Sequence, residues 1–358
     1  MPDAPAQELT AVVGAPSPLP GTPVSVTYAA PTIAWTVAIP AAPIVSPIIT
    51  ADRVIAAHLP GIVAGYSRED GRELWRVELI PEGALATDDT LVFVPAGEAI
   101  HALRTSDGAV AWRSPSAPVT APLVVKEGWL IVATPGRLSG RRAADGSVVW
   151  TVDALMRPLG AAISGNVLFV AATGARLVAR DLADGRLIWE RPLGGDPGTP
   201  LVVGDEVFVG ASDKRFYCVD ALTGEMEWPA RRVGATIRGT PVSDGYRIFF
   251  AALDNQVHAL DRSDGAIRWA KGVPFRPTTG PYTAGGSVFV VGPGAELRVL
   301  NATNGADLGT IALPNRQALP PGFLAEESGA VFAAVTGSLA ESWNLTLTFP
   351  IPVRPASR

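Results

Sequence analysis

The sequence predicts an all-β protein, an eight-bladed β-propeller of four-stranded antiparallel blades, from a repeated glycine, a repeated tryptophan and the strands between them. A glycine recurs seven times at steps of 37 to 41 residues, and each of the first six precedes a tryptophan by four residues. A fixed period of about 40 residues indicates one supersecondary unit stacked many times. The glycines are Gly71, Gly108, Gly146, Gly185, Gly224, Gly265 and Gly305. The tryptophans are Trp75, Trp112, Trp150, Trp189, Trp228 and Trp269.

The clearest copy of the unit runs from Thr199 to Arg231 and contains the runs TPLVV, EVFVGAS, RFYCVDA and TGEMEWPAR. Each run is short, rich in Val, Phe or Tyr, or bounded by Gly, Asp or Ser, as strands joined by tight turns are. No longer segment has the three- and four-residue apolar spacing of an amphipathic helix. One unit is therefore four antiparallel strands, and we expect almost no helix.

The repeated glycine follows Asp or Asn in six units and Thr223 in the fifth unit. Glycine adopts positive φ without steric cost, and Asp or Asn can hydrogen-bond the local backbone, so these pairs fit structural hairpin turns. The tryptophan then lies on the outer strand, where its ring could bury on the order of 200 Å² between neighbouring sheets. We expect it to dock one blade on the next. The seventh unit has Gly309 in place of the tryptophan, so we expect that seam to pack differently.

Sequence is left over at both ends of the seven units, and the remainders fit each other. The run TIAWTVA at 32–38 reads as an outer strand, with Trp35 lying 40 residues before Trp75. Near the other end GFLAEE, AVFAAV and residues 342–349 supply three strands. Closing a ring removes exposed strand edges, which invite aggregation. We therefore expect an eighth blade in which the N-terminal strand joins the C-terminal strands.

The repeats resemble the PQQ-like β-propeller family, whose units carry a pattern close to A-L-D-x-x-T-G-x-x-x-W. The pattern appears as CVDALTGEMEW in Cys218–Trp228 and as ALDRSDGAIRW in Ala259–Trp269. The resemblance covers nearly all of residues 29–349 and also implies eight blades. The family includes quinoprotein dehydrogenases, which hold pyrroloquinoline quinone (PQQ) and calcium on the central axis, and BamB-like non-catalytic members of an outer-membrane assembly machinery. The repeat alone does not choose between these functions.

We divide the chain into a flexible Pro/Ala-rich segment at 1–28, the propeller at 29–349 and a tail at 350–358. The first segment resembles a spacer that tethers a domain, which favours a cell-envelope or extracellular location if an export signal has been removed; otherwise the protein is cytoplasmic. Residues 9–51 contain no charged residue, but prolines interrupt them and their apolar part matches the strand pattern. We therefore expect no transmembrane segment, although the N-terminal segment could hold the protein at a membrane surface.

The formal net charge of −5 argues against a nucleic-acid partner, which would require a basic stripe. The one cysteine, Cys218, lies in a strand among Val and Tyr and is expected to be a small buried hydrophobe. His101 and His258 occupy the same slot in two different units. That slot places them on opposite sides of the ring, too far apart to share a metal ion. We expect no catalytic residue and no metal site.

The resemblance to quinoprotein dehydrogenases implies specific features that this sequence lacks. The alcohol-oxidising members carry adjacent cysteines whose disulfide covers the quinone, and one cysteine cannot form it. Their long insertions build the calcium site and the catalytic aspartate, whereas the connections here are short. We therefore expect no cofactor, with PQQ and calcium as the alternative.

Three arginines, Arg157, Arg238 and Arg276, fall in connections that lead into an inner strand. In a propeller such connections open onto one end of the central channel, where arginines could bind an anionic ligand or an acidic partner by bidentate hydrogen bonds. We predict a non-catalytic, BamB-like scaffold for protein–protein interaction. The alternative is a redox protein or sensor that binds PQQ or another small anion in the channel. A third hypothesis, recognition of peptides or sugars, depends on whether Trp129 and Trp343 are exposed at a rim.

Overall fold

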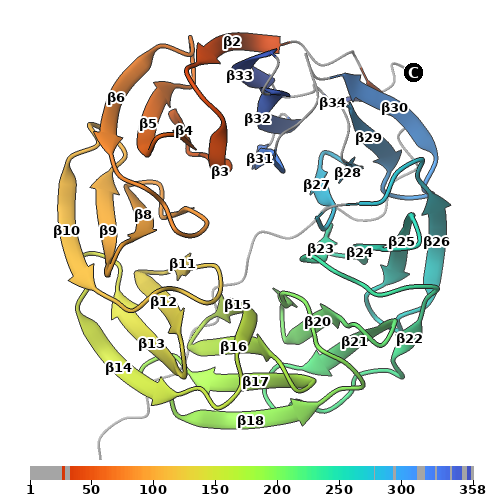
Figure 1. Cartoon of the computed structure of the whole chain (residues 1–358). Helices are drawn as coiled ribbons and strands as arrows, with labels where there is room; N and C mark the ends of the chain where they lie inside the picture. Colours follow the sequence, from red (N-terminus) through yellow and green to blue (C-terminus); the bar gives the residue numbers. More distant parts are fainter. Residues whose placement is uncertain are drawn as a thin grey trace, which may run out of the picture.

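The computed structural model describes residues 26–28, 33–277, 279–292, 296–312, 319–326, 329–338, 341–348 and 353–355. These residues form eight four-stranded antiparallel sheets, arranged as blades in a ring around a central axis (Figure 1). The described part of the chain consists of strands and their connections, with no helix. The predicted all-β, eight-bladed propeller is confirmed.

Each of the first seven blades runs in sequence from its inner to its outer strand. Blades 1 and 2 contain β3 (Pro43–Ile49), β4 (Arg53–His58), β5 (Ile62–Ser67), β6 (Glu73–Glu78), β7 (Ala86–Thr87), β8 (Leu91–Ala96), β9 (Ala99–Arg104) and β10 (Val110–Pro115). Blades 3 and 4 contain β11 (Val124–Lys126), β12 (Trp129–Thr134), β13 (Arg137–Arg142), β14 (Val148–Asp153), β15 (Pro158–Ser164), β16 (Val167–Ala172), β17 (Arg176–Asp181) and β18 (Leu187–Pro192). Blades 5 and 6 contain β19 (Leu201–Val203), β20 (Glu206–Gly210), β21 (Arg215–Asp220), β22 (Arg231–Arg232), β23 (Val242–Ser243), β24 (Arg247–Ala252), β25 (Gln256–Asp261) and β26 (Ile267–Gly272). Blade 7 contains β27 (Tyr282–Ala284), β28 (Ser287–Val291), β29 (Glu296–Asn301) and β30 (Asp307–Ala312).

Blade 8 closes the ring with strands from both ends of the chain. Its inner strands are β31 (Gly322–Glu326), β32 (Gly329–Ser338) and β33 (Glu341–Thr348), and its outer strand is β2 (Ile33–Ile39). The β2 strand pairs antiparallel with β33, with Trp35 opposite Leu347. The predicted closure by an N-terminal strand is therefore confirmed.

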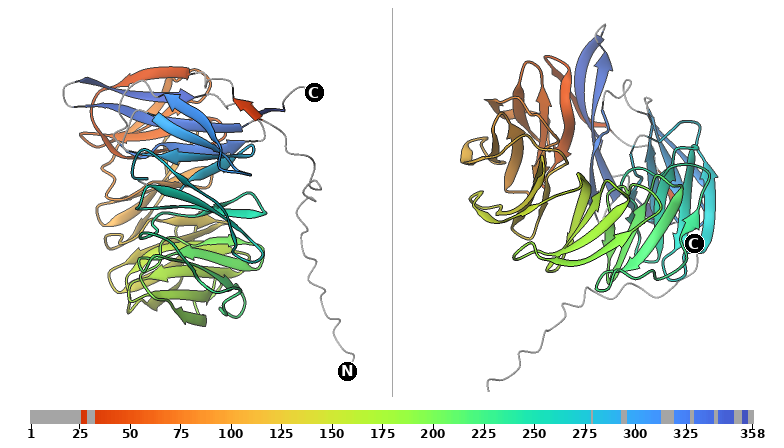
Figure 2. Two further views of the ribbon diagram at one scale, coloured as in Figure 1. Left: turned by 90° about the vertical axis from the view of Figure 1, so that its right-hand side faces the viewer. Right: turned by 60° about the horizontal axis from the view of Figure 1, so that its bottom comes forward.

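A short two-stranded ribbon joins the two ends of the chain beyond blade 8. In it β1 (Val26–Tyr28) pairs antiparallel with β34 (Val353–Pro355). Figure 2 shows this ribbon outside the ring of blades. The sequence did not indicate this pairing. The other residues of the predicted flexible segment, 1–25, and residues 349–352 and 356–358 lie outside the described part of the chain.

Each repeat tryptophan lies across the turn of the following blade. The indole Nε1 of Trp75 donates a hydrogen bond to the carbonyl oxygen of Thr105 at 2.8 Å. Gly108 has a φ of 71°, and a Cβ atom added to it would lie 2.5 Å from Cε3 of Trp75. The corresponding indole bonds run from Trp35 to Arg68, Trp112 to Ala143, Trp150 to Leu182, Trp189 to Ala221, Trp228 to Arg262 and Trp269 to Ala302. The glycine therefore provides both the backbone conformation and the space that the ring needs.

The outer strand of blade 5 is much shorter than the run TGEMEWPAR suggests. Only Arg231–Arg232 form the strand β22, and a single bridge pairs Met226 with Val219. Pro229 stands between these two segments and cannot donate a backbone hydrogen bond. The proline explains why the ladder is interrupted in this blade.

The seam between blades 7 and 8 is packed by aromatic residues near the inner strands instead of an outer tryptophan. Gly309 has a φ of 117° and no atom within 4 Å of a Cβ added to it. Tyr282 stacks on Phe323 at a centroid distance of 4.5 Å, and Phe289 meets Phe332 edge-on at 5.3 Å. The seam therefore buries large rings on the first and second strands of both blades.

Candidate functional site

The strand order gives the disc two different faces. The linker face, as we call it, carries the connections between blades and the turns between second and third strands. These two sets of loops bond to each other, as when Leu79 N donates to the Gly61 carbonyl at 2.8 Å and Val233 N to the Lys214 carbonyl at 2.9 Å. The turn face carries the turns between first and second and between third and fourth strands. Each candidate residue can be assigned to one of these faces.

The three predicted arginines all lie on the linker face, and all three are exposed. Arg238 and Arg276 lie in neighbouring connections. These connections are in close contact, as a Cβ atom added to Gly239 would lie only 2.2 Å from Gly280 N. Arg157 lies in the connection between blades 3 and 4, two blades from Arg238. Within the described residues, no hydrogen bond or ion pair holds any of the three guanidinium groups. A shared binding role for them stays a prediction.

The linker face also exposes large aliphatic side chains that the sequence analysis did not single out. Leu155 is 98% exposed and stands two residues before Arg157. Ile80 is 59% exposed and Leu59 is 51% exposed, in the loops of blade 1. A fully exposed leucine beside an unpaired arginine offers both an apolar and a charged contact. A partner protein could bury both.

A groove of about 720 Å³ lies between blades 1 and 2 on the linker face. His101 of β9, Arg113 of β10 and Glu82 line it. Burial and the nearby Arg113 charge lower the pKa of His101. The groove therefore presents a neutral imidazole beside an exposed arginine at neutral pH.

A second groove, of about 540 Å³, lies between blades 2 and 3 and contains a buried arginine. Arg141 of β13 is only 5% exposed. Its Nη1 donates to Ser114 Oγ at 2.9 Å and to the Pro115 carbonyl at 3.1 Å. Its Nε lies 3.4 Å from Ser139 Oγ. Sequence reasoning missed Arg141, although aligning the repeats by their tryptophans, or by Gly309 in blade 7, places it at a position that is Leu in blades 2, 6 and 7.

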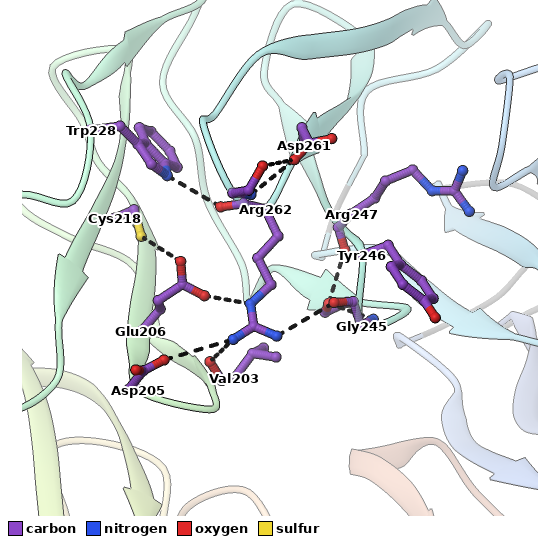
Figure 3. A network of polar contacts seen from close by, with 12 residues as sticks. Val203, Asp205, Glu206, Cys218, Trp228, Gly245, Tyr246, Arg247, Asp261 and Arg262 are labelled. Atoms are coloured by element: carbon purple, nitrogen blue, oxygen red, sulfur yellow. Dashed lines mark hydrogen bonds and ion pairs between the residues drawn. The ribbon is translucent and has the colours of Figure 1, made fainter. Parts of the chain in front are cut away.

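On the turn face, Arg262 links blades 5 and 6 (Figure 3). Its Nε donates to Glu206 Oε2, its Nη2 donates to the Val203 carbonyl at 3.0 Å, and its Nη1 donates to the Gly245 carbonyl at 3.4 Å. Asp205 lies 3.9 Å from the same guanidinium group. Every nitrogen of this group has a partner, so Arg262 joins the two blades and offers little to a ligand.

Among the described residues, the buried Cys and His side chains lie in separate blades. Cys218 is fully buried, and burial together with the charge of Glu206 raises the pKa of its thiol, which keeps it protonated. His58 and His258 are buried in blades 1 and 6. Among the described residues no three His, Cys, Asp or Glu side chains are grouped so that they could hold a metal ion.

Neither off-repeat tryptophan stands free at a rim. Trp129 is half-buried, with the Arg142 guanidinium 4.5 Å from its ring centroid. Trp343 is half-buried against the core of blade 8. The hypothesis of an exposed aromatic rim for peptides or sugars therefore has no support from these two residues. In the part of the chain that the structure describes, no helix is long and apolar enough to cross a membrane.

The eight blades and their repeated tryptophan turns define a PQQ-like β-propeller. The model of the family described as outer membrane protein assembly factor BamB matches residues 60–271 and 230–310, which is more than half of the chain. The chain therefore belongs to this family. No curated protein matches it significantly.

Solved structures of several kinds share the fold. BamB from Moraxella catarrhalis has a TM-score of 0.72 at 20% identity, over 89% of this chain and 100% of that one. The computationally designed Ika8 protein has a TM-score of 0.71 at 12% identity, over 87% and 98%. Quinohemoprotein alcohol dehydrogenase ADHIIG from Pseudomonas putida HK5 has a TM-score of 0.68 at 12% identity, over 92% and 78%. At these identities the likeness shows the fold alone.

Proposed function

We propose that this protein is a non-catalytic scaffold that binds a partner protein on its linker face, in the cell envelope. One observation carries the proposal: Leu155, 98% exposed, and the exposed Arg157 stand together in one connection. Exposed apolar side chains are common one by one, but arginine is enriched at protein interfaces, and this leucine adds apolar area beside it. Membership in the BamB-described family supports the same kind of role.

The mechanism in this proposal is rigid display. Closed blades with buried seams hold the connections of the linker face in fixed positions, so binding orders few backbone segments. The N-terminal segment would tether the disc at a membrane surface. Because the fold serves unrelated functions, the proposal rests on this face and not on the propeller itself.

The experiment places a photo-crosslinking amino acid at position 155 or at position 222 in cells of the source organism. Leu222 is the matched control, because it is 77% exposed but lies on the turn face. We expect a discrete crosslinked product from position 155, and its loss when Arg157 is also changed to Glu. Equal products from positions 155 and 222, or none from position 155, would overturn the proposal.

The alternative function, binding of PQQ with calcium, has little support from the described residues. The calcium would need oxygen ligands, and the described chain holds no suitable group of three acidic or His/Cys side chains. Cys218 is single and buried. We propose that the protein works without this cofactor. Titration with PQQ and calcium, followed by tryptophan fluorescence, should show no saturation; saturation at micromolar concentration would favour the alternative.

A further inference from the structure

We propose that the groove between blades 2 and 3 is a carboxylate-binding site, that Arg141 is the residue that holds the carboxylate, and that an acidic side chain of an extended partner segment supplies it. The proposal rests on the proposed function for the source of the carboxylate. It does not rest on Leu155 or on the three exposed arginines. The residues that carry it come from β10, β13, β14, the connection after β10 and the turn between β8 and β9.

Arg141 is a buried cation without a counter-ion. Its hydrogen bonds go to a serine hydroxyl, a proline carbonyl and a second serine hydroxyl. Among the described residues no carboxylate forms an ion pair with it, and its Nη2 has no hydrogen-bond partner. Burial is the sole cause that lowers the pKa of Arg141, with no acidic group opposing it. A buried charge normally requires a charged partner, and here the partner is missing.

The partly buried Arg262 of blade 6 shows how this fold satisfies a guanidinium group when it serves only to join blades. Arg262 pairs with Glu206 and lies 3.9 Å from Asp205. Arg141 is the more deeply buried of the two residues, yet it has no such pair. Its open nitrogen is therefore available to a group from outside the chain.

The repeat also shows that the fold does not need an arginine at position 141. Gly140 pairs with Trp150 in blade 3, as Ala102 pairs with Trp112 in blade 2, so Arg141 and Leu103 occupy the same register. Leu260 and Leu300 hold this register in blades 6 and 7. In blade 4 it is Arg180, whose Nη1 donates to the Gly185 carbonyl at 2.8 Å. Arg180 provides a matched control.

The groove favours a single carboxylate on an extended chain. Its volume is about 540 Å³, and Pro115, Pro118 and Val148 give it apolar walls beside Arg141. Glu98 lines the same groove, so a multiply charged phosphate would meet repulsion that one carboxylate meets less. The groove lies on the linker face, where a peptide segment can enter from the surface. A peptide with one acidic residue flanked by apolar residues fits these features.

The test selects peptides from a random phage-displayed library against the whole chain. We expect the selected peptides to share one Asp or Glu. Changing that residue to Gln or Asn should weaken binding to the wild type by about tenfold. In Arg141→Leu the acidic and amide peptides should bind equally, because the two changes remove the same interaction. Arg180→Leu should retain the discrimination, and Arg141→Lys should retain part of it.

The outcomes separate this proposal from the proposed function. Peptides without a shared acidic residue, or unchanged discrimination in Arg141→Leu, would overturn the site. If glutarate or phosphate binds through Arg141 at matched ionic strength and no peptide binds, the idea that a peptide supplies the carboxylate is overturned. Failure of the position 155 crosslink beside Arg141-dependent peptide binding would overturn the proposed Leu155 contact and leave the carboxylate site standing. The melting temperatures of both leucine variants verify that they are folded.

Discussion

His258 shows how one position of the repeat can be satisfied in one blade and left unsatisfied in the next. It lies eleven residues before Trp269, where Tyr217 lies eleven before Trp228. Tyr217 donates its hydroxyl hydrogen to Asp213 at 2.5 Å. His258 stacks on Phe250, and neither of its ring nitrogens has a hydrogen-bond partner. In blade 5 the Tyr217 hydroxyl therefore reaches the Asp213 carboxylate. In blade 6 the shorter imidazole of His258 forms no such hydrogen bond.

The buried His258 should make stability depend on pH. Burial lowers its pKa below the usual 6.5, although the charge of Asp254 opposes this. The unfolded chain then binds a proton that the folded chain does not, so stability should be lost as the pH falls below 6.5. The slope contributed by one such group is at most about 1.4 kcal/mol per pH unit. As the pH is lowered from 7.5 to 5, the melting temperature should fall less steeply in His258→Tyr than in the wild type. Parallel curves for the two proteins would contradict this.

Arg141 and Leu155 are the residues for which sequence reasoning was least adequate. An arginine in a strand reads as one more polar position, and a leucine in a short connection reads as part of the core. Their importance depends on exposure, which is 5% for Arg141 and 98% for Leu155. Exposure is decided by the neighbouring blades and connections, which no local pattern describes.

At the scale of the blade, the seam is the element that the repeat specifies best. The tryptophan and the turn glycine recur together, because both depend on residues at a fixed spacing, and the structure adds an indole hydrogen bond at each of these seams. The exception is the seam at Gly309, where Tyr282 and Phe332 help to fill the interface. Blade 5 keeps the seam contacts of Trp228, although Pro229 interrupts its outer strand. Because the tryptophan is missing at Gly309, we predicted that this seam packs differently from the others. Which rings would replace it depended on contacts between distant segments.

Gly108 and Gly136 together separate the two roles of glycine in the seam. Their φ angles are 71° and 72°, but only Gly108 faces an indole, that of Trp75. Gly136→Ala should cost about 1 kcal/mol for the left-handed backbone. Gly108→Ala should destabilise the protein by about 1–3 kcal/mol more than Gly136→Ala does, because its Cβ would overlap the indole ring. Denaturant unfolding of the two variants measures the difference, and equal costs would show that the seam tolerates the added methyl group.

At the scale of the whole molecule, ring closure depends on a single strand from the N-terminal end. The β2 strand covers the edge of β33, and Trp35 carries the seam on to blade 1 through its hydrogen bond to the Arg68 carbonyl at 2.9 Å. Without β2, both the β33 edge and the side of blade 1 that packs on Trp35 would be exposed. Open strand edges pair with other chains.

Deleting residues 1–41 should therefore convert the protein into an aggregating or oligomeric species with a lower melting temperature. Deleting only residues 1–25 is the matched control, since it leaves every described strand in place, and we expect that variant to keep the wild-type melting temperature. Size-exclusion chromatography with light scattering measures the outcome. A folded monomer after the longer deletion would show that seven blades and three strands suffice.

The sequence by itself determined the strand period, the number of blades and the closure of the ring. These follow from turn residues, apolar runs and one aromatic residue at fixed spacing, all of which act over a few residues or between adjacent units. Only the tertiary structure decided that Arg141 is buried without a counter-ion, that Leu155 is exposed and that Arg157 lies apart from Arg238. These properties depend on which side chains from separate blades and connections share one region of space, because desolvation and charge pairing act through distance and not through sequence separation.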